Sequence, residues 1–207
     1  PGNSTKGEAH GTQVYGILGA SRNTGKGVHG VAKNVQILAV RAVPDGDEYD
    51  KDVALALRYA VDNGAKVINT SFGKGYSPKK QWVWDAIKYA ASKDVLIVNA
   101  AGNDGKNIDV EKTFPNDSKD LITEISDNVL TVGAMSVNYN EKLPAGFSNY
   151  GKKNVDIFAP GSAIYSTMPY ATRNQILPCI AQLKFKMKVS RGRSVLKTTE
   201  KEFLRPS

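Results

Sequence analysis

The sequence predicts an α/β fold: a three-layer arrangement in which a parallel sheet carries helices on both faces. Apolar segments of strand length alternate along the chain with segments of helical periodicity. The strand-like segments are nearly continuous in apolar residues, which is typical of strands buried on both faces. A strand–helix–strand–helix–strand order produces parallel sheets covered by helices.

The alternation begins with a helix over residues 10–20. Val14, Ile17 and Leu18 share one face of it, as a 3.6-residue period requires. Residues 21–30 are rich in Gly, Asn and Ser and are predicted to form a loop.

A strand and a second helix follow. Residues 35–43 are almost all apolar and predict a strand. Asp52 is placed as the N-cap of a helix that runs through Asp62. Gly64 then stands where a left-handed C-terminal cap is expected.

The rest of the sheet is predicted from four more apolar segments and one helix. That helix opens at Ser77-Pro78 and runs to about Ser92, with Pro78 suited to its first turn. The strands are expected at 65–72, 95–101, 129–134 and 156–159. Ligands of such sheets bind at the carboxyl ends of the strands, so the residues that end the first two of these strands are candidates for a binding site.

The bulk properties indicate a globular body with a basic tail. Residues 1–170 hold 19 Lys and Arg against 18 Asp and Glu, whereas residues 171–207 hold 9 against 2. We therefore expect two parts: a domain over 1–170 and an unrelated basic tail over 171–207, either disordered or produced by a frameshift. A basic tail can attract nucleic acid, but the body carries no nucleic-acid-binding pattern, and no nucleic-acid partner is expected. No apolar run approaches the ~20 residues of a membrane span.

Several motifs in the domain occur in a fixed order. They are His10-Gly11-Thr12 with Gly16, Gly30-Val31-Ala32, Val67-Ile68-Asn69-Thr70-Ser71-Phe72-Gly73, Ala100-Ala101-Gly102-Asn103, Val132-Gly133-Ala134, Phe147-Ser148 and Ala159-Pro160-Gly161 with Ser166-Thr167. Over about residues 8–170 this series resembles the subtilisin-like serine proteases. The resemblance implies a subtilisin-like fold that is incomplete at both ends.

The resemblance assigns catalytic roles to two residues. His10 matches the family's general base, which must lie within hydrogen-bond reach of a serine hydroxyl. Asn103 matches the asparagine whose amide stabilises the oxyanion. Read without the family, Asn103 is equally a turn residue before Asp104-Gly105.

Two segments match the walls of the family's substrate cleft. These substrate-binding candidates are Ser71, Phe72, Gly73, Ala100, Ala101 and Gly102. Their small side chains suggest a roomy apolar pocket for the residue before the cleaved bond. The implied partner is a peptide or protein substrate.

Two catalytic residues of the family find no match. Only nine residues precede His10, so the aspartate that orients the base is not expected in this chain. The Gly-Thr-Ser-Met-Ala motif of the nucleophile should follow Ser166-Thr167 but does not, and the resemblance stops at about Tyr170. A frameshift, a gene rearrangement or a sequence assembly error would each explain this.

The sequence therefore supports two functions of different classes. The first is a serine endopeptidase that acts through an acyl-enzyme, of which this chain alone is expected to be inactive. The second is a pseudoprotease fragment that binds peptides without cutting them. The resemblance implies no organic cofactor and allows calcium, for which the acidic loop 104–127 offers oxygens without EF-hand spacing. It also implies secretion or a place in the cell envelope.

Overall fold

The computed structural model describes residues 9–22, 25, 27–32, 34–43, 47–138 and 143–168. Outside these residues lie the predicted tail at 171–207, with its serines Ser190 and Ser194, and the predicted boundary at residue 170.

The predicted parallel sheet is confirmed. Within the described residues it has four strands in the order β1-β2-β3-β4, and every neighbouring pair is parallel. The strands are β1 (Val67–Thr70), β2 (Leu96–Ala100), β3 (Val129–Met135) and β4 (Ile157–Pro160). Because all four run in the same direction, their carboxyl ends lie along one edge.

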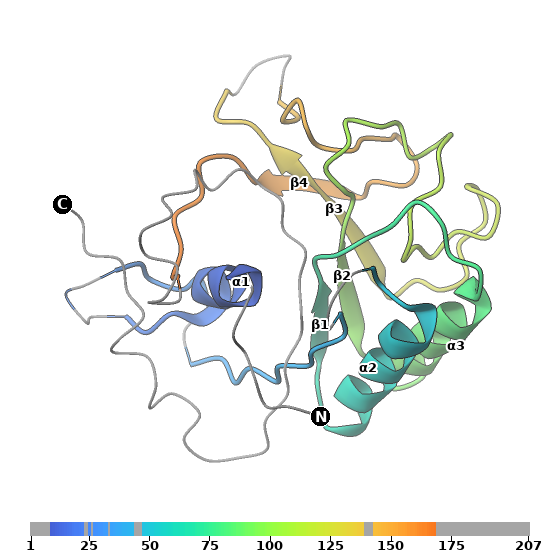
Figure 1. Ribbon diagram of the computed structural model, residues 1–207, viewed down its shortest axis with the longest axis horizontal. Coiled ribbons are helices and arrows are strands. Elements are labelled where there is room, and N and C mark those ends of the chain that lie inside the picture. Colours follow the sequence, from blue (N-terminus) through green and yellow to red (C-terminus); the bar gives the residue numbers. More distant parts are fainter. Residues whose placement is uncertain are drawn as a thin grey trace.

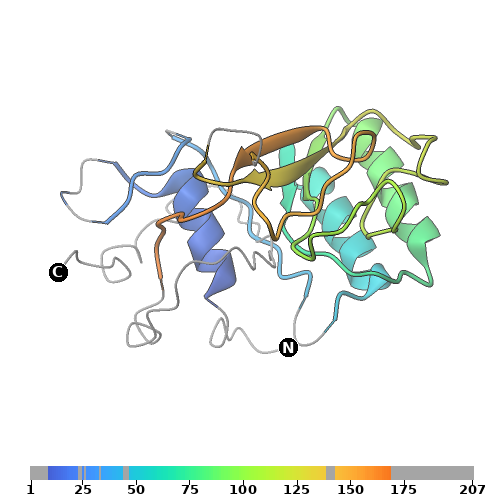
Figure 2. The same ribbon diagram turned by 90° about the horizontal axis from the view of Figure 1, so that it is seen from above.

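Helices lie on both sides of the sheet. Helix α2 (Asp50–Asp62) packs against α3 (Lys80–Ala91), and the two cover one face. Helix α1 (His10–Gly19) lies on the other side, as both views show (Figures 1 and 2). None of the helices in the described part is long and apolar enough to cross a membrane.

The main core lies between the sheet and the α2–α3 layer. Leu57 of α2, Ile68 of β1 and Ile87 of α3 are each at most 3% exposed and belong to one buried cluster. Val14 of α1 belongs to the same cluster. Burying such aliphatic side chains is the dominant stabilising contribution in a domain of this kind.

The predicted strand at 35–43 is wrong as a strand, although its burial is partly correct. Ala42 and Val43 belong to the main core and Leu38 packs against it. The segment is assigned to none of the four strands of the described sheet. Ala39 forms a single bridge, the apolar residues 37–40 are partly buried, and Val35 at the start of the segment is 41% exposed.

The helix starts also differ from prediction. Helix α2 begins at Asp50 with Tyr49 as its N-cap, so Asp52 lies inside the first turn. Helix α3 begins at Lys80, two residues after Pro78. Gly64 does follow α2 with a φ of 84°, as predicted for a left-handed cap.

Candidate functional site

The two predicted cleft walls lie at adjoining strand ends. Thr70 and Asn99 are partners in the register of β1 and β2, so Ser71 and Ala100 leave the sheet side by side. This places the Ser71–Gly73 and Ala100–Gly102 segments at the carboxyl edge, where ligands of parallel sheets bind.

The first wall, residues 71–73, is held in place by the long acidic loop 104–127. Lys74 N donates to Phe114 O over 2.9 Å, and Phe114 N donates back to Lys74 O over 2.8 Å. At Gly73 an added Cβ would come within 3.2 Å of Phe114 O. The small residue therefore lets the two backbones approach, and the long loop supports this wall.

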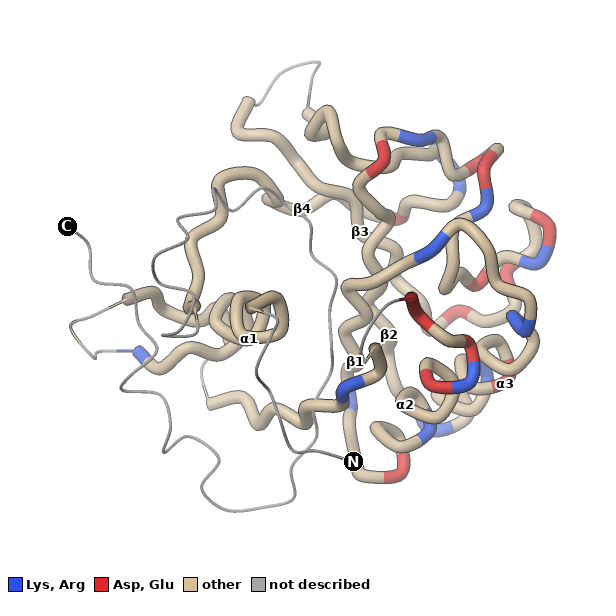
Figure 3. Tube along the Cα trace, in the orientation of Figure 1, with Lys and Arg blue, Asp and Glu red and all other residues tan. Residues whose placement is uncertain are grey.

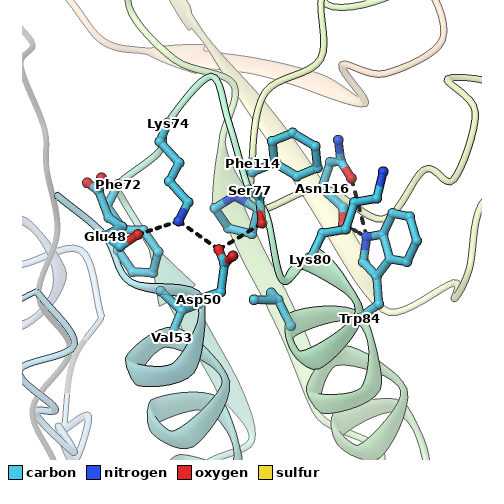
Figure 4. A pocket seen from close by; sticks show the side chains of 12 residues that line it. Glu48, Asp50, Val53, Phe72, Lys74, Ser77, Lys80, Trp84, Phe114 and Asn116 are labelled. Atoms are coloured by element: carbon cyan, nitrogen blue, oxygen red, sulfur yellow. Dashed lines mark hydrogen bonds and ion pairs between the residues drawn. The ribbon is translucent and has the colours of Figure 1, made fainter.

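A pocket opens behind the first wall (Figure 4). The buried Phe72 side chain lines it, together with Phe114 and Trp84. Its polar side is an ion pair between Lys74 and Asp50, with Nζ and Oδ1 2.6 Å apart. None of Ala100, Ala101 and Gly102 lines this pocket, so it is distinct from the roomy apolar pocket that the sequence predicts between the two walls, which stays a prediction.

Asp50 anchors this ion pair. Its carboxylate also accepts the Ser77 hydroxyl over 2.7 Å and the Lys79 amide over 2.7 Å. Burial alone would raise the pKa of Asp50, but the hydrogen bonds from Lys74 and Ser77 outweigh it and hold the pKa below its usual value. Asp50, Lys74 and Ser77 were missed from sequence, because no local pattern shows that a lysine after the first wall meets a helix start.

The turn after β2 presents Asn103 to solvent. Ala101 is 2% exposed and its amide donates to Val132 O over 2.9 Å, which continues the sheet. Gly102 then adopts a φ of 108°, a conformation that L side chains rarely take. Asn103 follows with an exposed side chain, so its amide is open to a ligand at the carboxyl edge.

His10 lies at the start of α1, on the side of the sheet away from α2 and α3 (Figure 1). It is the first residue of α1 and is partly buried. The helix is held by the chain that leaves β4: Thr167 Oγ1 donates to Thr12 O over 2.7 Å, and Ser166 Oγ donates to Gln13 O. Figure 1 shows this segment running from β4 to α1. No hydrogen bond joins His10 to Asn103 in the described part of the chain.

Among the described residues, charged residues gather on the half that holds α2, α3 and the long loop 104–127 (Figure 3). Helix α1 has no acidic residue in its first turn and no basic residue in its last turn.

Two acidic residues of the long loop 104–127 direct their oxygens at backbone amides. Asp109 accepts the amides of Lys152, Lys153 and Asn154, and Asp120 accepts those of Ile122 and Thr123. These oxygens are directed at backbone donors of different loops. In the described ranges no group of three or more His, Cys, Asp or Glu side chains is arranged to hold a metal ion.

Comparisons with known proteins agree with this arrangement. The family model described as "Subtilase family" matches residues 1–194. The chain is 40% identical over 160 residues to a thermophilic serine proteinase of Bacillus sp. (strain AK1), covering 77% of this chain and 36% of that protein. It is also 40% identical over 168 residues to a cell wall-associated protease of Bacillus subtilis (strain 168), covering 81% of this chain and 17% of that protein.

Solved structures share the fold. A cold-adapted subtilisin-like serine proteinase superposes with a TM-score of 0.60 at 31% identity, covering 77% of this chain and 51% of that one. The chain thus spans only part of the length of the proteins it resembles. A match over residues 1–194, together with the parallel sheet, shows that the chain belongs to the subtilase family.

Proposed function

We propose that the protein to which this chain belongs is a serine endopeptidase that hydrolyses peptide bonds through an acyl-enzyme. The observation that carries the proposal is the exposed amide of Asn103 on a held turn, beside two small-residue segments at the carboxyl edge of a subtilase sheet. Family membership alone makes peptidase activity an expectation, whereas this edge of the sheet offers a specific site for it.

The proposed roles follow from acyl-transfer chemistry. His10 acts as general base and takes the proton of the attacking serine hydroxyl. Asn103 donates a hydrogen bond to the oxyanion of the tetrahedral intermediate. Loss of such a donor costs on the order of 3 kcal/mol in a subtilisin, a value that belongs to the family and not to this chain.

The substrate is a peptide or protein chain that lies between the two walls. Ser71, Phe72 and Gly73 line one side, and Ala100, Ala101 and Gly102 the other. Small residues at both strand ends leave room for a large apolar side chain before the cleaved bond. No organic cofactor enters the proposal.

The second candidate is a peptide-binding pseudoprotease. It is favoured by the absence of a Gly-Thr-Ser-Met-Ala match in the 207 residues. Without an oriented base, turnover in serine proteases falls by about 10⁴, and without the nucleophile no acyl-enzyme forms. The chain alone is therefore proposed to be inactive.

A fluorophosphonate probe tests the inactivity. We expect no labelling of the purified 207-residue chain, with the thermophilic serine proteinase of Bacillus sp. (strain AK1) labelled in parallel as a positive control. Labelling at any serine would show that a nucleophile is present and would overturn this part of the proposal.

The gene itself separates the two candidates. If a frameshift removed the nucleophile, reads across codons 168–175 recover Gly-Thr-Ser-Met-Ala in another frame. The protein expressed from that frame should then react with the probe, and His10→Ala should abolish the reaction. Clean reads without the motif in any frame would leave the pseudoprotease as the function of this chain.

Secretion or placement in the cell envelope is proposed from the family and from the cell wall-associated relative. Immunodetection in medium, envelope and cytoplasmic fractions tests it, and recovery in the cytoplasm alone would contradict it.

A further inference from the structure

Asn149 is a fully buried asparagine next to the turn that carries Asn103. It is 0% exposed, and it lies outside the helices and strands. Its side-chain oxygen accepts the amides of Asp104 over 3.0 Å and Lys106 over 2.9 Å. Its side-chain nitrogen donates to Ala101 O over 2.9 Å. One side chain thus makes three hydrogen bonds to a single turn.

The partners of Asn149 lie on both sides of Asn103. Its backbone amide adds a fourth bond, to Gly102 O over 2.9 Å. Residues before and after Asn103 are therefore tied to the same asparagine, while the Asn103 side chain itself stays exposed. The clamp fixes the backbone and leaves the functional amide open.

Gly102 belongs to the same arrangement. A Cβ at Gly102 would lie 2.3 Å from the Asn149 side-chain nitrogen. The space that a side chain at 102 would need is occupied by the asparagine amide. The positive φ of Gly102 and the buried amide of Asn149 thus depend on each other.

The two ends of the turn are held by backbone bonds: Ala101 N donates to Val132 O over 2.9 Å, and Asn107 forms a bridge with Tyr150. Between these ends, the Asn149 side chain bonds the amides of Asp104 and Lys106, and one further backbone bond runs from Gly105 N to Phe147 O over 2.9 Å. A buried amide with all its partners in place stabilises one conformation, whereas a partner left unsatisfied in the interior is penalised. The conformation of the turn therefore depends strongly on one side chain.

We propose that Asn149 is a positioning residue: it fixes the backbone of residues 101–106 and so sets the direction in which the Asn103 amide projects at the carboxyl edge. The importance of that direction for catalysis rests on the proposed function. The clamp itself does not, since it is a property of the folded chain.

Amide hydrogen exchange of the 207-residue chain tests the clamp. Asn149→Leu is nearly isosteric and removes all three side-chain bonds, whereas Asn149→Asp keeps the acceptor for Asp104 and Lys106. We expect exchange at these two amides to accelerate at least about tenfold in Asn149→Leu and markedly less in Asn149→Asp. The helical amide of Leu57 serves as the internal reference and should stay unchanged.

Asn128 provides a matched control. Its side-chain nitrogen donates to Val95 O over 2.8 Å, at the end of the sheet away from the carboxyl edge. Asn128→Leu should leave exchange at Asp104 and Lys106 unaltered. The ¹H–¹⁵N signal of the Asn103 side-chain amide should shift in Asn149→Leu and not in Asn128→Leu.

Two results would overturn the inference: unchanged exchange at Asp104 and Lys106 in folded Asn149→Leu, or equal acceleration at these amides and at Leu57. If Asn149→Leu does not fold, Asn149→Asp decides: it keeps the acceptor for Asp104 and Lys106 but loses the donor to Ala101 O, so an unmoved Asn103 side-chain signal in this variant would contradict the clamp. Neither readout involves hydrolysis, so an inactive chain does not affect the outcome.

Discussion

Asp109 joins two loops that flank the candidate site. Its carboxylate accepts the backbone amides of Lys152, Lys153 and Asn154, at distances from 2.6 to 3.2 Å, as well as the Asn154 side chain over 2.9 Å. Burial would raise its pKa, but the bonds from Asn154 and the two lysine amides outweigh burial and lower the pKa. One carboxylate thus holds the backbone of residues 152–154, which lead into β4.

Replacing this carboxylate should destabilise the molecule. Hydrogen bonds to charged groups contribute roughly 1.5–3 kcal/mol, so we expect Asp109→Ala to lower the free energy of unfolding by about 2–3 kcal/mol. Urea denaturation measures it. Asp127→Ala removes an exposed carboxylate from the same loop and should change stability by less than about 0.5 kcal/mol. Equal losses in the two variants would contradict the role of Asp109.

At this scale the sequence identifies residues that belong to motifs and misses those that act across the chain. His10 and Asn103 are predicted as site residues because short local patterns surround them, and their roles stay predictions. Asn149 and Asp109 meet partners more than 40 residues away, and no spacing rule links such residues. Phe147-Ser148 pointed to the segment that contains Asn149, but not to the bonds of that side chain.

In the α2–α3 layer, helix α2 has one buried face and one exposed face. Leu57 of α2 is 3% exposed in the main core, whereas Leu55 on the same helix is 58% exposed. The two leucines thus have the same helix context and opposite burial.

This pair gives a matched test of the layer. Leu57→Ala should lower the free energy of unfolding by about 2–5 kcal/mol, because it leaves a cavity in the core. Leu55→Ala should change it by less than about 0.5 kcal/mol. Thermal or urea unfolding of both variants measures the difference, and similar losses would show that the α2 face is misassigned.

Element types were more predictable than element limits. Four strands and three helices follow from apolar periodicity, because burial on the sheet faces sets that periodicity. The segment 35–43 has a similar apolar content but carries a single bridge, at Ala39, and no strand in the described part of the chain, and composition does not distinguish the two cases. Helix α2 begins at Asp50, earlier than predicted. The Asp50 carboxylate accepts hydrogen bonds from Ser77 and Lys79, a tertiary contact that no capping rule includes.

For the whole molecule, one acidic group makes the free energy of unfolding lower at neutral pH than near pH 4. Asp117 is partly buried, and burial together with the nearby Glu124 and Asp156 raises its pKa to about 6. The usual value is about 3.9. Because the pKa is raised on folding, the stabilising contribution is present below about pH 4 and is lost as the pH rises through about 6.

Asp117→Asn removes this titration. We expect the variant to match the native chain near pH 4 and to exceed its free energy of unfolding by about 1–2 kcal/mol above pH 7. Urea unfolding between pH 4 and pH 8 measures the difference, in which contributions from Asp50 and Asp109 cancel. A difference that is independent of pH, or one like that of the exposed Asp104→Asn, would contradict the assignment.

The bond between Thr167 and Thr12 joins residues 155 positions apart. Helix α1 has only ten residues, and helices shorter than about 12–15 residues are marginal on their own in water. During synthesis, residues 10–19 emerge long before the segment that holds them, and closing so large a loop delays their docking. We therefore expect helix α1, which bears His10, to dock late in folding, after β4 and the segment that follows it are in place.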